Sequence, residues 1–133
     1  MAKGYQRQQQ RRGLLNAFGK DLVRRSRSKC ELCESSGSKL QAFEVEPLSP
    51  EPEVDRCIFI CQKCKDELTQ VRLLDLGHWK CLYNSIWSDV PAVQVMTLRL
   101  LKKIAQKEHW AQELIEQVYL EDEMMEWVDE VDM

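Results

Sequence analysis

The chain has 133 residues, of which 44% are hydrophobic and 31% are charged. This length is typical of one domain, and the composition is close to the average of globular proteins, which excludes wholesale disorder. No apolar run reaches the roughly 18 residues that are needed to cross a bilayer. The basic, Gln-rich start has no apolar segment behind it. We therefore expect no secretion signal, no membrane contact and a cytoplasmic location.

The net charge of −3 conceals opposite charges at the two ends of the chain. Residues 1–29 carry a charge of +8, whereas residues 111–133 carry −9 and contain no Lys or Arg. This asymmetry predicts either a basic arm that seeks an anionic partner such as nucleic acid, or two ends that attract each other. The attraction could act within one chain or between copies, and the sequence leaves these alternatives open.

Apolar periodicity predicts a basic amphipathic helix over residues 6–27. Gly13 and Gly19 weaken this prediction, because each costs about 1 kcal/mol relative to Ala inside a helix. If the helix forms, its apolar side chains are expected to pack on the body of the protein; they are Leu14, Leu15, Phe18 and Leu22.

Short strands are expected at residues 40–45 and 57–60, on either side of a Pro-rich loop. The second CxxC unit is expected to open a polar helix that runs through Leu68. The stretch 74–90 is aromatic and irregular, and Trp79, Trp87 and Trp110 are expected in the core.

The last part of the chain is expected to be helical. Pro91 suits the first turn of a helix, which should run to about Lys107. A second helix should follow around residues 110–119, and then a short acidic helix around Met125 and Val128.

The most informative motif is a pair of CxxC units, Cys30-Glu-Leu-Cys33 and Cys61-Gln-Lys-Cys64, separated by 27 residues. The gap of two residues lets one tight turn point both sulfurs at a single ion, and four thiolates satisfy tetrahedral Zn²⁺. Four protein ligands leave no coordination position for a catalytic water. The spacing therefore predicts a structural zinc site whose ligands are Cys30, Cys33, Cys61 and Cys64.

Two other interpretations of these thiols stay open. The CxxC units could be redox dithiols or disulfides of a secreted chain, although no signal peptide and no thioredoxin-like βαβ pattern accompany them. A site of four thiolates could also hold iron, because this donor set is typical of both metals.

The expected order of turn, strand, loop, strand and helix around the cysteines resembles a treble-clef zinc finger. It also resembles the HNH nucleases, which carry a His pair before a proline and a His after the last CxxC. Here Phe43 and Glu44 precede the proline, and Lys65 follows the last cysteine. A lysine is protonated at neutral pH and cannot ligate a catalytic metal. We expect no nuclease activity, and a degenerate HNH-like protein that binds nucleic acid stays an alternative.

Four segments carry a second resemblance: SRSKCELC (26–33), DRCIFICQKC (55–64), HWKCLYNSIWSDVPAVQVM (78–96) and VYLEDE (118–123). Together they resemble the bacterial PhnA family, which is named from an alkylphosphonate-utilisation operon and carries an N-terminal zinc ribbon. The resemblance implies a small cytosolic zinc-binding protein that is linked to phosphonate uptake or breakdown. It does not imply an enzyme.

His78 and Cys81 form an HxxC unit that could be half of a second metal site, with His109 and Cys57 to complete it. The favoured interpretation is that His78 and Cys81 are packed and hydrogen-bonded. Cys57 lies in a strand-like run, where a free cysteine commonly behaves as a small buried apolar residue.

Two classes of function follow from these patterns. The favoured class is a non-catalytic binding or accessory module linked to alkylphosphonate utilisation, whose partner is a protein, a second copy of the chain, or nucleic acid bound through residues 1–29. The alternative is an enzyme that acts through residues 78–96, where the nearest approach to a polar cluster is His78, Cys81, Asn84 and Asp89.

The expected fold class is α+β. We expect a basic amphipathic helix at residues 1–27, a treble-clef or zinc-ribbon module at residues 28–70, and a mainly helical PhnA-like region at residues 71–133.

Overall fold

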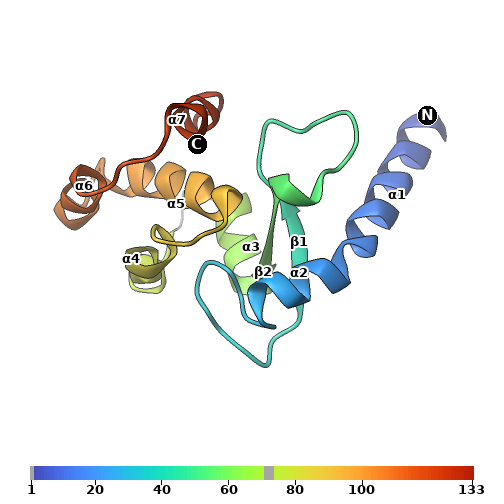
Figure 1. Ribbon diagram of the computed structural model, residues 1–133, viewed down its shortest axis with the longest axis horizontal. Coiled ribbons are helices and arrows are strands. Elements are labelled where there is room, and N and C mark those ends of the chain that lie inside the picture. Colours follow the sequence, from blue (N-terminus) through green and yellow to red (C-terminus); the bar gives the residue numbers. More distant parts are fainter. Residues whose placement is uncertain (1, 71–73) are drawn as a thin grey trace.

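The computed structural model describes residues 2–70 and 74–133, and it combines helices with one small sheet, as expected. The sheet and one helix lie at the centre, with the N-terminal helices on one side and the C-terminal helices on the other (Figure 1). The boundary that we expect after residue 70 borders residues 71–73, which lie outside the described residues. The elements are α1 (Ala2–Ala17), α2 (Gly19–Ser26), β1 (Leu40–Glu44), the 3-10 turn η1 (Val54–Arg56), β2 (Cys57–Cys61), α3 (Gln62–Thr69), the 3-10 turn η3 (His78–Cys81), α4 (Leu82–Ser85), α5 (Pro91–Ile104), α6 (His109–Glu116) and α7 (Asp122–Asp129).

The N-terminal segment is helical, but it forms two helices instead of the single one expected over residues 6–27. The break is at Phe18, whose N–H bonds to the carbonyl of Leu15 at 3.2 Å and closes the last turn of α1 early. Gly19, a poor helix former, follows at once. The break lets Leu22 reach the core, where it is fully buried. The expectation that Leu14 packs on the body is wrong, because its side chain is exposed.

Two arginine clamps attach these helices to the rest of the molecule. Arg11 donates to both carboxylate oxygens of Glu44 at 2.5 and 2.7 Å. Arg25 donates to both oxygens of Glu31 at 2.6 and 3.0 Å and to the carbonyl of Cys57 at 2.8 Å. Bidentate pairs of this kind fix direction as well as distance. The basic arm is thus held by acids near the sheet, and no ion pair joins it to the acidic C-terminal region among the described residues.

The sheet is an antiparallel pair of strands in which Leu40 lies opposite Cys61 and Glu44 lies opposite Cys57. Because side chains alternate along a strand, the two faces of the sheet differ. Ile58 and Ile60 are fully buried and point to the side of the core. The expected strands are confirmed to within one residue at their C-terminal ends.

The C-terminal half forms three helices at the expected places. The helix that begins at Pro91 ends at Ile104, three residues before the expected end, because residues 105–107 close a turn. The expected irregular stretch 74–90 contains two short helical turns, η3 and α4. Of its tryptophans, Trp79 is fully buried, whereas Trp87 is 55% exposed, so the expectation for Trp87 is wrong.

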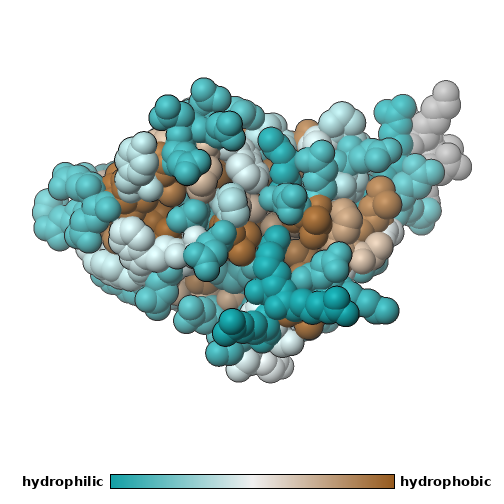
Figure 2. Space-filling view, viewed as in Figure 1, coloured by the Kyte–Doolittle hydropathy of each residue, from teal (hydrophilic) through white to brown (hydrophobic). Residues whose placement is uncertain are grey.

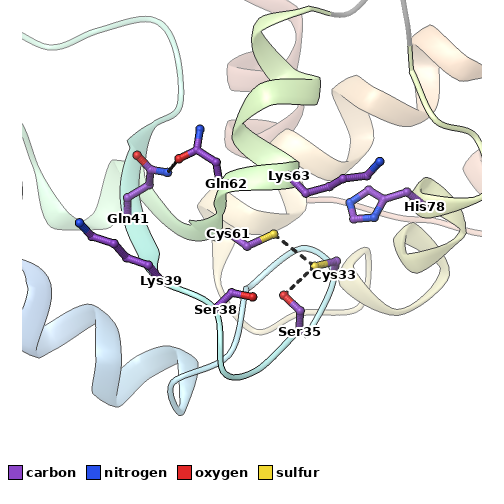
Figure 3. Close-up of a pocket in the computed structure, with 9 residues that line it drawn as sticks. All are labelled: Cys33, Ser35, Ser38, Lys39, Gln41, Cys61, Gln62, Lys63 and His78. Carbon is purple, nitrogen blue, oxygen red and sulfur yellow. Dashed lines mark hydrogen bonds between the residues drawn. The ribbon is translucent and has the colours of Figure 1, made fainter.

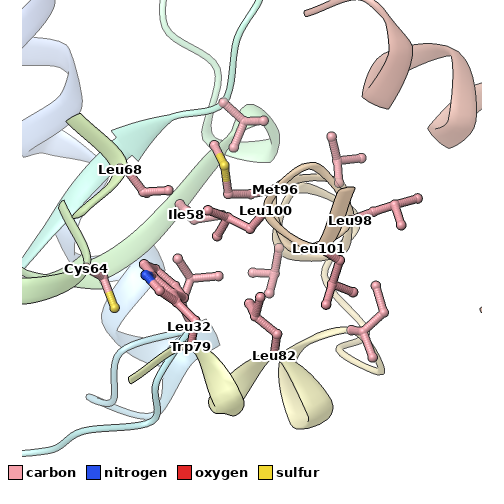
Figure 4. Packing of buried hydrophobic residues seen from close by; sticks show 14 of the residues in the cluster. Leu32, Ile58, Cys64, Leu68, Trp79, Leu82, Met96, Leu98, Leu100 and Leu101 are labelled. Atoms are coloured by element: carbon pink, nitrogen blue, oxygen red, sulfur yellow. The ribbon is translucent and has the colours of Figure 1, made fainter. Parts of the chain in front are cut away.

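One buried cluster connects the cysteine-bearing segments with the C-terminal helices (Figure 4). Leu32 from the first CxxC turn and Ile58 from β2 belong to the same cluster as Trp79 and as Leu100 from α5. Apolar burial is the main favourable contribution to folding. Contacts with the C-terminal helices therefore stabilise the segment around the cysteines, in addition to the contacts within that segment.

Arg99 of α5 fixes the C-terminal helix α7. It is buried, and its guanidinium donates to the main-chain carbonyls of Trp127 and Val128 in the last turn of α7, the latter at 3.2 Å. Carbonyls at the end of a helix often lack a partner within the helix. Arg99 supplies such a partner to Val128 and adds a second one to Trp127, whose carbonyl also accepts from the N–H of Glu130 at 3.3 Å.

We expect Arg99→Met to destabilise the protein by about 2 kcal/mol, the typical worth of hydrogen bonds to a charged group. Urea unfolding followed by tryptophan fluorescence would measure this loss. Lys102→Met is the matched control, because Lys102 pairs with Asp129 at an exposed position where an ion pair contributes less than about 1 kcal/mol. Equal losses in the two variants would contradict the role given to Arg99.

Candidate metal centre

The first CxxC unit is a tight turn stabilised by main-chain hydrogen bonds. The N–H of Glu34 bonds to the carbonyl of Cys30 at 2.8 Å, and Glu34 has a positive φ of 64°. The N–H of Cys33 points to the sulfur of Cys30 at 3.5 Å, and the N–H of Cys30 bonds to the carbonyl of Ser35 at 3.0 Å. The turn therefore directs the Cys30 sulfur inward and gives it an N–H partner.

The second CxxC unit lies where β2 passes into α3. Cys61 is the N-cap of α3, in extended conformation, and Cys64 lies in its first turn. The N-terminus of a helix carries unpaired N–H groups and a partial positive charge, which stabilise a thiolate nearby. Cys61 and Cys64 are both buried.

The structure brings the four cysteine sulfurs together in one place. All four lie within 4.8 Å of one another, with 3.7 Å between Cys30 and Cys64 and 3.6 Å between Cys33 and Cys61. A tetrahedral ion that binds sulfur at about 2.3 Å separates its ligands by about 3.8 Å, whereas a disulfide needs about 2.0 Å. The spacing fits a tetrahedral metal ion, which these four residues could hold.

Hydrogen bonds and burial move the pKa values of three thiols of the cluster in different directions. The hydrogen bond with Cys64 lowers the pKa of Cys30 to about 4 against the effect of burial, with further help from main-chain N–H groups. The same hydrogen bond raises the pKa of Cys64, and burial raises the pKa of Cys33. One thiolate can thus form alone, but four adjacent thiolates need a metal ion to balance their charge.

A cavity of about 380 Å³ opens beside Cys33 and Cys61 (Figure 3). Polar side chains form most of its wall, and Ser35 Oγ lies 3.2 Å from the Cys33 sulfur. The cavity gives an ion or a chelator a path to these two sulfurs from solvent, which a metal site needs for loading. Its wall consists of Cys33, Ser35, Ser38, Lys39, Gln41, Cys61, Gln62, Lys63 and His78.

His78 lies beside the cysteine cluster, a position that the sequence did not predict. Its Nε2 lies 3.2 Å from the Cys64 sulfur, so it is the hydrogen-bonded residue that was expected, with a metal-site thiol as its partner. The N–H of His78 bonds to Asp75 at 3.2 Å, and its ring packs edge-on against Trp79. Groups that hydrogen-bond a ligand atom orient it and adjust its basicity. The HxxC spacing indicated His78 as a candidate ligand, but no local pattern in the sequence predicted its contact with Cys64.

We expect His78→Phe to weaken metal retention by about 10–100-fold, the usual effect of losing a partner of a ligand. Competition with a chromogenic chelator would measure the change. His109→Phe is the matched control, because His109 is exposed on α6 and its ring pairs with Glu113, away from the cysteines. Unchanged retention in His78→Phe would show that the contact with Cys64 has no effect on the metal.

The other cysteines are not part of this cluster. Cys57 is fully buried, as expected, and its thiol donates to the carbonyl of Glu53 at 3.3 Å. Burial raises the pKa of Cys57 to about 11 and that of Cys81 to about 12. Both are therefore neutral thiols at physiological pH, and neither joins a second group of possible metal ligands among the described residues.

The side chains considered for catalysis are not joined to one another by hydrogen bonds among the described residues. Glu44 is held by Arg11, and Lys65 donates to Gln41 at 3.0 Å. In the part of the chain that the structure describes, no hydrogen bond joins His78 or Cys81 to the exposed Asn84 and Asp89.

Comparison with known proteins finds no matching family model, curated protein or solved structure. No helix within the described residues is long and apolar enough to cross a membrane. The function is therefore inferred from the site and from the sequence.

Proposed function

We propose that the chain is a small zinc-binding protein of the PhnA type. It acts in the cytoplasm as a non-catalytic binding or accessory module linked to alkylphosphonate utilisation. The observation that carries the proposal is the group of four cysteine sulfurs within 4.8 Å of one another. Four thiolates complete the coordination of Zn²⁺, so the ion holds the fold together and has no position for a substrate.

The elements around the cysteines support a treble-clef arrangement. The first pair of ligands lies in a turn, the hairpin of β1 and β2 follows, and the second pair lies at the start of α3. The ion would then join the turn that precedes the hairpin to the helix that follows it. A segment of about 40 residues rarely folds without such a metal or a disulfide.

The PhnA-like segments lie around the proposed zinc site, which is why we retain this family in the proposal. The HWKC sequence forms η3, which supplies both His78 beside Cys64 and the buried Trp79. The VPAVQVM sequence begins α5 at Pro91, and α5 packs into the same core as Ile58. The segment thus combines support of the metal with support of the core.

Elemental analysis of the purified protein tests the metal, and we expect about one zinc per chain. Replacing zinc with Co²⁺ should give the strong near-ultraviolet absorption of cobalt bound to thiolates. If the analysis finds about one iron per chain and no zinc, the metal of the proposal is iron. Full zinc content in a variant that lacks all four thiols would overturn the assignment of the ligands.

Growth tests the link to phosphonate. In a bacterium that encodes this chain, deletion should slow growth on an alkylphosphonate as sole phosphorus source and should leave growth on phosphate unchanged. The intact gene and His109→Ala should restore growth, whereas Cys61→Ser should not. Equal growth of the deletion strain on both sources would overturn the link without affecting the metal assignment.

A further inference from the structure

A groove runs between the N-terminal helices and the sheet, next to the cavity beside Cys33 and Cys61, with which it shares Lys39 and Gln41. Its volume is about 540 Å³, within the range of about 300–1,000 Å³ that is typical of binding clefts. Leu15 of α1 and Leu40 and Ala42 of β1 give it an apolar surface, together with Phe59 of β2. Figure 2 shows apolar side chains over the lower half of α1, surrounded by hydrophilic ones.

The rim of the groove is positively charged. Arg12, Lys39 and Lys65 line it, and no carboxylate does. None of these three forms an ion pair in the described part of the chain, and Lys65 bonds only to the neutral side chain of Gln41. Three cations without acidic partners around an apolar floor fit a segment that combines an aromatic side chain with carboxylates.

The chain itself contains such a segment at residues 119–123, which leads from the link after α6 into the first turn of α7. Tyr119 is 84% exposed, the most exposed of the large hydrophobic side chains. Glu121, Asp122 and Glu123 follow it, are exposed, and form no ion pair among the described residues. An exposed aromatic ring flanked by unpaired carboxylates is typical of a residue that anchors an interface.

The two surfaces cannot meet within one molecule in this fold. The link between α6 and α7 lies on the opposite side of the molecule from α1 (Figure 1). We propose that the 119–123 segment of one copy docks in the groove of a second copy, with Tyr119 on the apolar floor and the carboxylates beside Arg12, Lys39 and Lys65.

A second copy suits the groove better than nucleic acid does. Single strands bind by stacking their bases on exposed aromatic rings, and the aromatic side chain in this groove, Phe59, is buried. The net charge of −3 and the −9 of residues 111–133 also repel a long polyanion. A short acidic segment brings only the three carboxylates of Glu121, Asp122 and Glu123 to the three cations of the rim.

The proposed contact is head to tail, since the groove and the segment are different surfaces. A contact of this kind leaves one free groove and one free segment in every open assembly, so the assembly either extends or closes into a ring in which neither is free. It also predicts a result that a symmetric contact does not give. A variant with a damaged groove keeps an intact segment, and a variant with a damaged segment keeps an intact groove. The two variants can therefore still bind each other.

The experiment uses sedimentation velocity on the full chain at 50 and 300 mM salt. The groove variant is Lys39→Glu with Lys65→Glu, and the segment variant is Tyr119→Ser with Glu121→Gln. Lys20→Glu with Arg24→Glu is the matched control, because it changes the net charge by the same amount at two positions that do not line the groove. Circular dichroism would confirm that each variant is folded.

We expect the unaltered chain to self-associate in a concentration-dependent way at 50 mM salt and much less at 300 mM, because salt screens exposed charges. The groove and segment variants should each associate at least about tenfold more weakly, because the first reverses the charge of the rim and the second removes the aromatic anchor and one carboxylate. Their equimolar mixture should form a dimer that grows no further. The control should associate as the unaltered chain does.

Three results would overturn the proposal. The first is a chain that stays monomeric at 50 mM salt, and the second is a mixture of the two variants that stays monomeric. The third is binding of a random duplex or a structured RNA that the groove variant loses while self-association is unchanged, which would assign the groove to nucleic acid.

Discussion

Replacing Cys64 with serine is expected to abolish zinc binding and to unfold the protein. A structural zinc site of four thiolates contributes about 10–16 kcal/mol at neutral pH, whereas a whole domain is stable by only about 5–15 kcal/mol. Cys64 is fully buried in the core and is the sulfur that His78 contacts. A serine there cannot supply the thiolate, and the other three sulfurs would stay close together without a cation.

The unfolding should extend beyond the segment that carries the cysteines. Ile58 and Ile60 of β2 share one buried cluster with Met96 and Leu100 of α5, so loss of the sheet exposes one side of α5. We expect a large decrease in helical circular dichroism and loss of the cooperative thermal transition. A chelator that removes zinc from the unaltered chain should give the same result.

Cys57→Ser is the matched control for this variant. Cys57 is also fully buried, but its thiol bonds to the carbonyl of Glu53, an acceptor that a serine hydroxyl can use. This control should keep one zinc per chain and a cooperative transition. A Cys64→Ser variant that binds zinc and melts as the Cys57→Ser variant does would contradict the assignment of Cys64 as a ligand.

The features that the sequence predicts correctly are those that a short segment determines. The gap of two residues in each CxxC unit is sufficient to form a turn, and the Pro-rich insertion between the units leaves their geometry intact. The structure confirms that the four sulfurs meet. The helix from Pro91 follows in the same way from a proline at its first turn and from apolar residues at helical spacing.

The features that the sequence does not predict depend on contacts between distant segments. His78 meets Cys64 only because η3 packs beside α3, and Arg11 meets Glu44 across 33 positions of the chain. The exposure of Trp87 also depends on distant segments, because a tryptophan in a loop is buried or exposed according to which helix covers it. Periodicity and spacing carry no information about such contacts.

Trp79 is the residue outside the cysteine cluster whose loss should have the largest effect. Its ring is fully buried in the same cluster as Leu32, Leu82 and Leu100, and it contacts the ring of His78 at a centroid distance of 4.9 Å. Figure 4 shows it in the buried cluster that also contains Cys64. It therefore packs between the metal centre and the helical core.

We expect Trp79→Ala to lower the free energy of unfolding by about 3–5 kcal/mol, the usual cost of removing a buried aromatic ring. The cavity would also free the ring of His78, so zinc should pass to a chelator more readily than from the unaltered chain. Urea unfolding with zinc in excess would measure the first effect, and chelator competition would measure the second.

Trp79→Phe distinguishes the contribution of the aromatic ring to stability from that of the indole N–H group. The indole Nε1 is buried and has no hydrogen-bond partner among the described residues, so its removal leaves no group unpaired. We therefore expect Trp79→Phe to recover most of the stability that Trp79→Ala loses, with the remainder due to the smaller ring. If Trp79→Phe is as unstable as Trp79→Ala, then the indole N–H makes an essential hydrogen bond, and apolar packing is not the main contribution of this side chain.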